Sequence, residues 1–426
     1  MARAMKDSGI EWIGEIPEGW ESKRLKYLVS YNDESLGEDT NPDYEFDYID
    51  IGSVEYGKGI TQYQHMRFAD SPSRARRVVH DKDVILSTVR TYLKAVATID
   101  DRDNPQIAST GFVVLRAKQG QITPDYLHYS VLSNAFVSLV EAKSTGISYP
   151  AINASEVVEI KIPVPKISEQ KRIADYLDSE CARIDAVIDQ TRATIEEYKK
   201  LKQSVITQAV TKGIRPGRKM KDSGVEWIDS IPEEWSMERG KGLFIEVDNR
   251  SEDGIEELLT VSQYTGITPR SQKNVNMFEA ETLEGYKICE IGDIAANTMW
   301  LWAGAIGVSN YRGVISPSYN IYRQKGENYD STYLDFLLRA APLVQHYESL
   351  SSGIRASRLR LYPQQFLSIR YPVPPMSEQK EIVSYLKEKI DDIDSLIQKK
   401  GQYLAEIESY KKSFIFEYVT GKKEVI

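Results

Sequence analysis

The sequence predicts a mixed α/β protein in which one unit, an α/β domain followed by a long helix, occurs twice. Three observations support this: two segments recur along the chain, short β-type runs lie between them, and an apolar seam of alternating three- and four-residue spacing follows each domain. With 426 residues, of which 41% are hydrophobic and 27% charged, the composition is that of a globular protein of two or more domains. We expect two domains joined by two long antiparallel coiled-coil helices with an internal pseudo-two-fold repeat.

The two recurring segments define the domain boundaries. MKDSGIEWIGEIPEGW at Met5–Trp20 returns as MKDSGVEWIDSIPEEW at Met220–Trp235, 215 residues later, and PVPKISEQKRIADYL at Pro163–Leu177 returns as PVPPMSEQKEIVSYL at Pro372–Leu386, 209 residues later. These offsets bracket half of the chain length, so the repeat fills the sequence. We expect a first domain with its N-terminal segment at 1–160, a first long helix at 161–214, a second domain with its linker segment at 215–370 and a second long helix at 371–426.

The two domains differ in side chains but keep a common skeleton. Asp83–Thr88 corresponds to Asp293–Thr298, and Ser144–Ile147 corresponds to Ser351–Ile354. Short β-type runs are separated by Gly, Asn and Asp turns, and short helical stretches follow them. The β-type runs include Tyr48–Val54, Val84–Val89, Phe112–Arg116 and Tyr319–Arg323, and the helical stretches are Pro124–Glu141 and Ser331–Ser349. The pattern indicates one scaffold that carries two different surfaces.

Each domain is followed by a long predicted helix. Ser168 is the expected N-cap of the first helix and Gly213 its expected end. The apolar seam comprises Leu177, Ile184, Ile188 and Ile195 in the first helix and Leu386, Ile393, Ile397 and Leu404 in the second. Polar residues interrupt the two seams at matching places, Thr191 and Lys400, and again Lys202 and Lys411. Two such helices bury their seams most economically against each other; the alternative is that each packs only on its own domain.

Cysteine content and apolar patterning indicate a cytoplasmic protein without a membrane segment. The two cysteines, Cys181 and Cys289, are too few for a disulfide framework and lack zinc-site spacing. The N-terminal residues contain no apolar stretch of signal-peptide length, and the longest apolar run, Met299–Val308, is about half of what a bilayer requires. A net charge of −9 is the reverse of the basic footprint of a free-standing nucleic-acid binder, so any DNA contact must come from local basic patches.

Catalytic and metal-binding motifs are missing from the sequence. There is no glycine-rich phosphate loop and no HExxH, and the four histidines are scattered. Asn41–Tyr44 resembles the NPPY-type signature of amino-group methyltransferases, but Asp replaces the second Pro, so we expect a loop there. Ser168–Lys171 and Ser377–Lys380 fit S-x-x-K, although the partner motifs of such serine enzymes are absent and the duplication favours a helix start. We expect a non-catalytic protein that holds neither metal nor cofactor.

Several loops carry side chains suited to DNA contacts. Arginine forms bidentate contacts with guanine edges and phosphates, and Asn and Gln suit adenine. The matching segments Arg90–Lys94 and Trp300–Gly304 keep their place in the scaffold while their chemistry changes, as expected if the two domains bind two different short sequences. Solvated arginines and, for the two tryptophans, core or interface packing are the alternatives. The candidate DNA-binding residues are Lys58, Gln62, Arg74, Arg76, Arg77, Arg90, Tyr92, Lys94 and Tyr149 in the first domain and Gln263, Tyr264, Arg270, Lys273, Asn297, Trp300, Trp302, Arg355 and Arg358 in the second.

Together, two variable domains, each preceded by an SGxEWI…IPxxW segment and followed by a PVPxxSEQ helix, resemble the specificity subunit of a type I DNA restriction-modification system. The resemblance covers essentially the whole chain. It implies that each variable domain is a target-recognition domain that binds one half of a bipartite double-stranded DNA target. It also implies that the helices set the spacer between the half-sites and dock two adenine-N6 methyltransferase subunits, through which restriction subunits join.

The resemblance places the chemistry on partner subunits. S-adenosylmethionine, ATP and magnesium would bind there, and the methyltransferases would supply positive potential that this chain lacks. We therefore expect weak DNA binding by the isolated chain and strong, salt-sensitive binding by the complex. The resemblance implies that this complex methylates host DNA or defends against foreign DNA. Two alternatives stay open: an enzyme with an unrecognised site, and a non-enzymatic coiled-coil scaffold whose α/β domains bind proteins.

Overall fold

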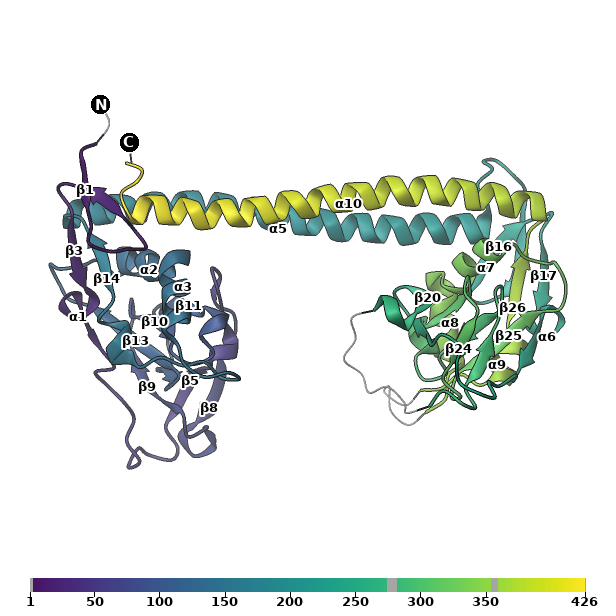
Figure 1. The fold of residues 1–426 in the computed structure, drawn as a ribbon, viewed down its shortest axis with the longest axis horizontal. Helices are drawn as coiled ribbons and strands as arrows, with labels where there is room; N and C mark the ends of the chain where they lie inside the picture. The colour runs from purple at the N-terminus through teal and green to yellow at the C-terminus, as the bar shows by residue number, and fades with distance from the viewer. Residues whose placement is uncertain (1–2, 274–281, 354–358, 426) are drawn as a thin grey trace. The chain divides into compact units, whose positions relative to one another are not determined.

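The computed structural model describes residues 3–273, 282–353 and 359–425. The chain divides into two compact units, Met1–Arg192 with Gln402–Ile426, and Ala193–Gly401. Each unit contains one α/β domain and a part of both long helices, α5 (Ile167–Lys212) and α10 (Met376–Val419). The predicted mixed α/β class with long helices is confirmed (Figure 1).

The domain of the first unit is built from two four-stranded sheets and smaller strand pairs. One sheet has the order β11-β10-β13-β4, and the other has the order β8-β5-β12-β9, in which β12 and β5 are parallel. Helix α2 packs on β10 and β11 and lies between that sheet and the long helices (Figure 1). The strands are β1 (Met5–Asp7), β2 (Glu15–Pro17), β3 (Glu21–Arg24), β4 (Val29–Tyr31), β5 (Glu45–Ile49), β6 (Val54–Glu55), β7 (Gly59–Ile60), β8 (Gln64–Arg67), β9 (Ala75–Val79), β10 (Val84–Ser87), β11 (Val96–Thr98), β12 (Gln106–Ser109), β13 (Phe112–Ala117) and β14 (Lys161–Val164), and the helices are α1 (Leu25–Leu28), α2 (Pro124–Leu132), α3 (Asn134–Lys143) and α4 (Ala154–Val157).

The second unit repeats the first of these two sheets, while its other described strands form two-stranded pairs. Its four-stranded sheet has the order β23-β22-β25-β18, which matches β11-β10-β13-β4 strand for strand. The helical stretches expected at Pro124–Glu141 and Ser331–Ser349 are each two helices, broken at Ser133 and before Pro342. The remaining elements are β15 (Met220–Val225), β16 (Ile228–Pro232), β17 (Ser236–Arg239), β18 (Phe244–Val247), β19 (Leu259–Ser262), β20 (Gly266–Pro269), β21 (Lys287–Cys289), β22 (Ile294–Ala296), β23 (Ile306–Val308), β24 (Gly313–Ile315), β25 (Asn320–Gln324), β26 (Arg370–Val373), α6 (Gly240–Leu243), α7 (Ser331–Leu338), α8 (Ala341–Leu350) and α9 (Pro363–Ser368).

A buried carboxylate immediately before β10 and before β22 explains why the Asp83 and Asp293 positions match in the sequence. Asp83 accepts two hydrogen bonds of 2.9 Å from Arg116 on β13. Asp293 accepts bonds of 2.7 and 2.8 Å from Arg323 on β25. Both carboxylates also accept a backbone N–H from the preceding turn. Because a buried carboxylate is costly without such partners, the pair fixes the register of the two central strands.

The recurring tryptophan and glutamate join each domain to the start of a long helix. In the first unit, Trp20 donates from Nε1 to Glu169 at 3.1 Å, and Arg3 pairs with the same carboxylate at 2.7 Å. In the second unit, Trp235 and Arg218 make the same contacts with Glu378. Burial raises the pKa of Glu378, but the hydrogen bonds from Arg218 and Trp235 outweigh burial and hold the pKa below its ordinary value.

The glutamine of each SEQ segment makes a second joint. Gln170 is fully buried, accepts from the backbone N–H of Thr123 at 2.8 Å and donates to the carbonyl of Pro165 at 2.9 Å. Gln379 accepts from Asp330 at 2.8 Å and donates to Pro374 at 2.9 Å. Thr123 and Asp330 are the N-caps of α2 and α7, so each glutamine ties the start of a long helix to a domain helix.

Segments of the two long helices pair within each unit. In the first unit, Lys411 of α10 forms an ion pair with Asp185 of α5 at 2.6 Å, and in the second unit Lys202 of α5 pairs with Asp394 of α10 at 2.7 Å. These lysines are the predicted polar interruptions of the seam, and their partners lie at matching repeat positions. All eight predicted seam residues are buried or half-buried. The pairing, and not packing on the domain alone, therefore covers the seam in each unit.

The ends of the helices correct one prediction and confirm another. Helix α5 begins at Ile167, so Ser168 lies inside the helix and is not its N-cap; the carbonyl of Lys166 accepts from Glu169 and Gln170 at 2.9 Å each. The helix begins one residue early because the buried Gln170 side chain holds the preceding backbone. Gly213 ends the helix with a left-handed φ of +72°, as expected. Within the described part of the chain, no helix combines the length and apolar character needed to cross a bilayer.

Candidate nucleic-acid interface

In the first unit, the turn between β10 and β11 is held in a defined conformation. Arg90 and Lys94 flank a short 3-10 turn, and both have left-handed φ values, 50° and 51°. The Thr91 hydroxyl donates to Ser144 at 2.9 Å, and Lys94 donates to Ser138 at 3.1 Å. Arg90 and Tyr92 are exposed, whereas Lys94 is half-buried against α3. The turn therefore presents Arg90 and Tyr92 and uses Lys94 as an anchor.

The loop at 144–151 lies against this turn. Thr145 and Ala151 exchange two backbone hydrogen bonds of 2.9 Å, and Ala151 also forms a bridge with Val89. The Arg90 guanidinium lies over the Tyr149 ring, 5.1 Å from its centroid. The side chains of Arg90, Tyr92, Ile147 and Tyr149, all exposed, form what we name the first tip surface. A cation beside aromatic and aliphatic groups is suited to contacts with phosphates, sugars and bases.

The other predicted residues of the first domain lie apart from this surface or have internal partners. Arg74 donates to the Tyr48 hydroxyl and to Asp50, both at 3.3 Å, and Arg76 lies over the Phe68 ring at 4.7 Å. Arg77 lies half-buried on β9, and its Nε atom is buried without a hydrogen-bond partner among the described residues. Lys58 pairs with Glu55, and Gln62 is exposed.

In the second unit, the equivalent turn between β22 and β23 carries aromatic groups. Trp300 and Trp302 stack with centroids 5.7 Å apart at 25°, and Trp300 is 50% exposed. Core packing is therefore excluded for Trp300, while Trp302 is half-buried and donates to the Met299 carbonyl at 2.9 Å. Asn297 is buried and donates to the Tyr319 hydroxyl at 2.9 Å, so it shapes the turn from within.

Four further predicted residues of the second unit lie in or beside the β19–β20 hairpin. Tyr264 is 82% exposed at the tip of the hairpin, and Gln263 is half-buried beside it. Arg339 of the α7 end donates to the carbonyls of Gln263 and Tyr264 and holds the hairpin in place. Arg270 and Lys273 are half-buried in and after a short 3-10 turn. Arg355 and Arg358 lie outside the described residues.

Two features were not found from the sequence. Ile147 is fully exposed at the tip of its loop, although an isoleucine is ordinarily assigned to the core. Arg102 lies 4.0 Å over the Tyr63 ring, and its Nε donates to the buried Asp47 at 3.4 Å, beside His65, which contacts the same carboxylate at 3.0 Å. No local signal marks Arg102, because it stands in an acidic stretch and its partner comes from a distant strand.

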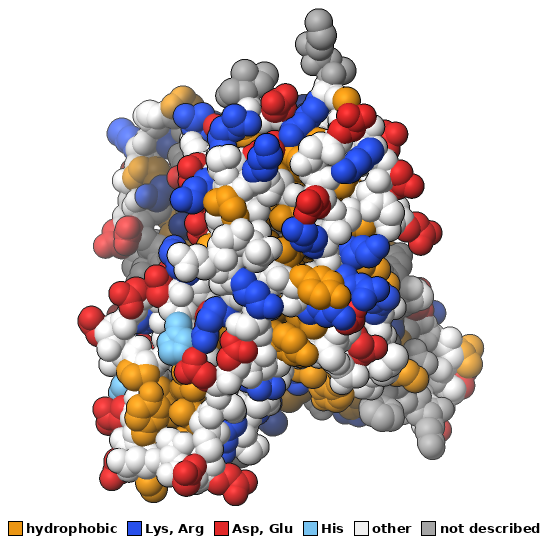
Figure 2. Space-filling view, turned by 90° about the vertical axis from the view of Figure 1, so that its left-hand side faces the viewer, with side chains coloured by type: hydrophobic (Ala, Val, Ile, Leu, Met, Phe, Trp, Pro, Cys, Tyr) orange, Lys and Arg blue, Asp and Glu red, His pale blue; other side chains and the backbone are white. Residues whose placement is uncertain are grey.

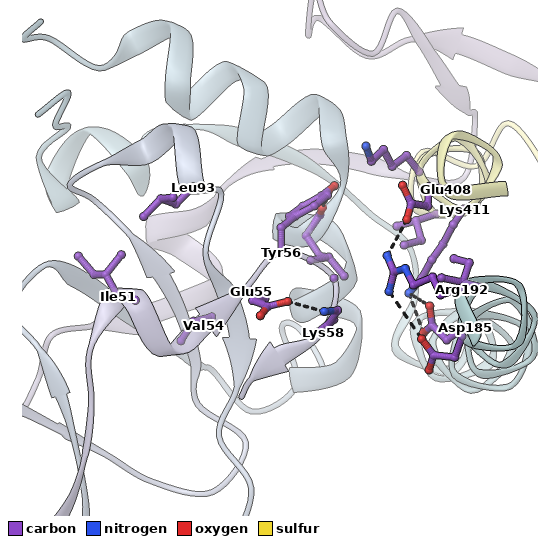
Figure 3. A pocket seen from close by; sticks show the side chains of 17 residues that line it. Ile51, Val54, Glu55, Tyr56, Lys58, Leu93, Asp185, Arg192, Glu408 and Lys411 are labelled. Carbon is purple, nitrogen blue, oxygen red and sulfur yellow. Dashed lines mark hydrogen bonds and ion pairs between the residues drawn. The ribbon is translucent and has the colours of Figure 1, made fainter. Parts of the chain in front are cut away.

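A hollow in the first unit is lined by paired charges. It has a volume of about 700 Å³ between the β6–β7 hairpin and the paired helices. Figure 3 shows Lys58 paired with Glu55 on one wall and, on the other, Arg192 with Glu408 and Lys411 with Asp185. On the face that Figure 2 presents, Lys and Arg side chains are interspersed with Asp and Glu. Neither feature is the continuous basic field expected for phosphates alone.

The catalytic look-alike motifs have structural roles. Ser168 and Lys171, like Ser377 and Lys380, are exposed on the first turns of α5 and α10, while the residues between them make the joints to the domains. Asn41–Tyr44 forms a turn, as predicted, with Tyr44 N donating to the Asn41 carbonyl at 2.9 Å. Among the described residues, no cluster of three or more His, Cys, Asp or Glu side chains is arranged to hold a metal.

Comparison with known proteins finds similarity to one family. Residues 17–197 match the model of the type I restriction modification DNA specificity domain. Across 97% of its length the chain is 24% identical to the MjaX type I restriction enzyme specificity subunit of Methanocaldococcus jannaschii, of which it covers 96%. It is 27% identical to the MjaVIII specificity subunit of the same organism over 75% of each chain.

Solved structures agree on the fold. A chain from a study of the assembly and conformational transition of the type I R-M system has a TM-score of 0.73 at 21% identity, covering 96% of this chain and 99% of that chain. The HsdS subunit from Thermoanaerobacter tengcongensis has a TM-score of 0.52 at 22% identity, covering 96% and 98%. The resemblance noted in the sequence is confirmed as a similarity: residues 17–197 match the specificity-domain model, and the chain is similar over nearly its whole length to a type I restriction enzyme specificity subunit.

Proposed function

We propose that this chain is the non-catalytic DNA-recognition subunit of a type I restriction-modification complex, in which each domain binds one half of a bipartite DNA target. One observation carries the proposal: the same turn of the same sheet presents Arg90 and Tyr92 in the first unit and Trp300 in the second. A scaffold that keeps its anchors and changes its exposed side chains is what two different half-sites require.

The paired helices supply the second part of the proposal. They set the spacer between half-sites and dock two adenine-N6 methyltransferase subunits, which restriction subunits can join. S-adenosylmethionine, ATP and magnesium bind to those partners, and the complex acts in the cytoplasm. The intermixed charge of this chain supports a division of labour in which the partners supply much of the attraction for phosphates.

The first experiment identifies the partners. The tagged chain is recovered from its own host lysate after nuclease treatment, and stoichiometric partners are identified by mass spectrometry. We expect a methyltransferase at about two copies per chain. Recovery of partners unrelated to DNA would contradict the proposal and favour a protein-binding scaffold.

The second experiment measures DNA binding. The chain alone and its complex with the methyltransferase are titrated with DNA that carries the methylated target, at low and at physiological salt. We expect weak binding by the chain and strong binding by the complex, with an affinity that falls steeply as salt rises. Equally tight binding with and without the methyltransferase would contradict the division of labour.

A further inference from the structure

The tip of the 144–151 loop exposes an aliphatic side chain that contributes nothing to the core. Ile147 has a relative exposure of 103%, the highest among the large hydrophobic residues of the described chain. Burying an isoleucine stabilises a fold through the hydrophobic effect, and this side chain forgoes that stabilisation in the free chain. Single exposed apolar residues are common on protein surfaces, so the exposure alone does not define a function.

The loop holds this side chain outward by specific contacts. The Thr145–Ala151 backbone pair closes the loop, the Ser144 hydroxyl accepts from Thr91, and Arg90 covers Tyr149. Gly146 has a φ of +110°, and a Cβ at this position would lie 3.1 Å from the Tyr149 carbonyl oxygen. Only glycine fits there without strain. The loop is thus built to present Ile147 beside an arginine and two tyrosines.

The internal repeat supplies an independent observation. Ser144–Ile147 returns as Ser351–Ile354, and the bridge that closes the loop in the first unit, Thr145 with Ala151, has its counterpart between Ser352 and Arg360. Ile354 itself lies outside the described residues, so only its place in the sequence is used. The adjacent turns have exchanged arginine and tyrosine for tryptophan, yet glycine followed by isoleucine is kept. The isoleucine is the same in both halves, although the neighbouring side chains suited to base contacts differ. We therefore assign to the isoleucine a role that does not depend on the half-site sequence.

We propose that Ile147 enters the DNA as an apolar wedge that partly unstacks one base step of the half-site, while Arg90 and Tyr149 contact the adjoining backbone. This inference rests on the DNA-recognition function proposed above. Aliphatic wedges flanked by cationic side chains separate base steps in duplexes that proteins deform. Both half-sites share one requirement that is independent of their sequence: an adenine must leave the stack to reach the methyltransferase. The other possible occupant, a methyltransferase subunit, is an outcome of the test.

The experiment uses the complex of full-length chain and methyltransferase, bound to duplex DNA that carries the sequence that this complex methylates. 2-Aminopurine replaces, one at a time, the purines of the half-site bound by the first domain. Wild-type complex should raise the fluorescence at one step, and Ile147→Ala should abolish most of that rise and weaken binding roughly tenfold. Ile147→Leu should restore both signals, and Ile291→Ala, which truncates an isoleucine exposed elsewhere, should change neither.

A mismatched duplex separates a wedge from a simple contact. A mismatch at the responsive step already unstacks the bases, so the binding defect of Ile147→Ala should shrink to within about twofold of wild type there. The proposal is overturned if Ile147→Ala binds and unstacks matched DNA like wild type, if the defect persists on mismatched DNA, or if the variant loses the methyltransferase in size-exclusion chromatography. Failure of the wild-type complex to bind any target would instead contradict the proposed function.

Discussion

The buried glutamine of each SEQ segment offers a test of how the long helices are held. Gln170→Ala removes three hydrogen bonds, of 2.8 Å from Thr123 N, 2.9 Å to Pro165 O and 3.3 Å to Gln121 O. It leaves the Thr123 N–H and the Pro165 carbonyl without these partners. At about 1–3 kcal/mol for each orphaned buried group, the free energy of unfolding of the first unit should fall by roughly 3 kcal/mol.

The repeat provides a matched second measurement. Gln379 makes the same three kinds of bond, at 2.8 Å from Asp330 N, 2.8 Å to Asn328 O and 2.9 Å to Pro374 O. Gln379→Ala should therefore destabilise the second unit by a similar amount. Gln208→Ala on the exposed face of α5 is the control and should stay within about 0.5 kcal/mol of wild type.

Hydrogen exchange with mass spectrometry is the suitable assay, because a chain with two units need not unfold in one step. Peptides covering α2 should lose protection in Gln170→Ala, and peptides covering α7 should lose protection in Gln379→Ala. A loss below about 1 kcal/mol in both variants, or equal losses in both units from one substitution, would refute the assignment of these glutamines as separate joints.

Three further predictions concern titration, backbone geometry and helix length. Burial lowers the pKa of His128 to about 4; the positive charge of Lys411 lowers this pKa further, and the negative charge of Asp178 opposes the shift. The unfolded chain therefore binds more protons than the folded chain between pH 6.5 and 4. Stability should fall by about 3 kcal/mol as pH drops through this window, and His128→Gln should flatten that slope in urea titrations at several pH values. A Cβ at Gly421, where φ is +71°, would lie 2.5 Å from Pro17, whereas a Cβ at Gly9 would have no atom within 4 Å. In thermal unfolding, Gly421→Ala should therefore lower the free energy of unfolding by about 2 kcal/mol more than Gly9→Ala. Adding one heptad to both long helices lengthens each by ~10 Å, so the spacer in the methylated target should grow by about three base pairs with unchanged half-sites; a changed half-site with an unchanged spacer would contradict the ruler.

The sequence predicted the scaffold well because its main contacts were duplicated. Trp20, Glu169 and Gln170 connect the first domain to the start of α5. All three lie in the two segments that recur nearly unchanged, so the sequence repeat alone indicated their importance. Lys411 appeared as an interruption of an apolar seam, and the structure accounts for it through Asp185 of the opposite helix. A seam pattern gives the face of one helix; it does not specify which carboxylate of another helix will neutralise a lysine.

The candidate interface was less predictable, because exposure is decided by tertiary neighbours. Asn297 and Trp300 stand three residues apart in one turn, yet the first is buried against Tyr319 and the second is half exposed. Arg102 is oriented by Asp47, which is 55 residues away in the chain. Ile147 was missed because an aliphatic residue is assigned to the core unless the loop around it is known to point outward.

The division between kept and changed residues has an energetic basis. A joint such as Gln379 is fully buried with several hydrogen bonds, so nearly any substitution costs stability, whereas exposed side chains such as Tyr92 and Tyr264 can be replaced at little cost to folding. New half-site preferences can therefore arise at the tips without loss of the scaffold. By the same reasoning, folding does not account for the fully exposed Ile147, and the isoleucine at the matching position of the second half of the sequence supports the proposed contact with DNA.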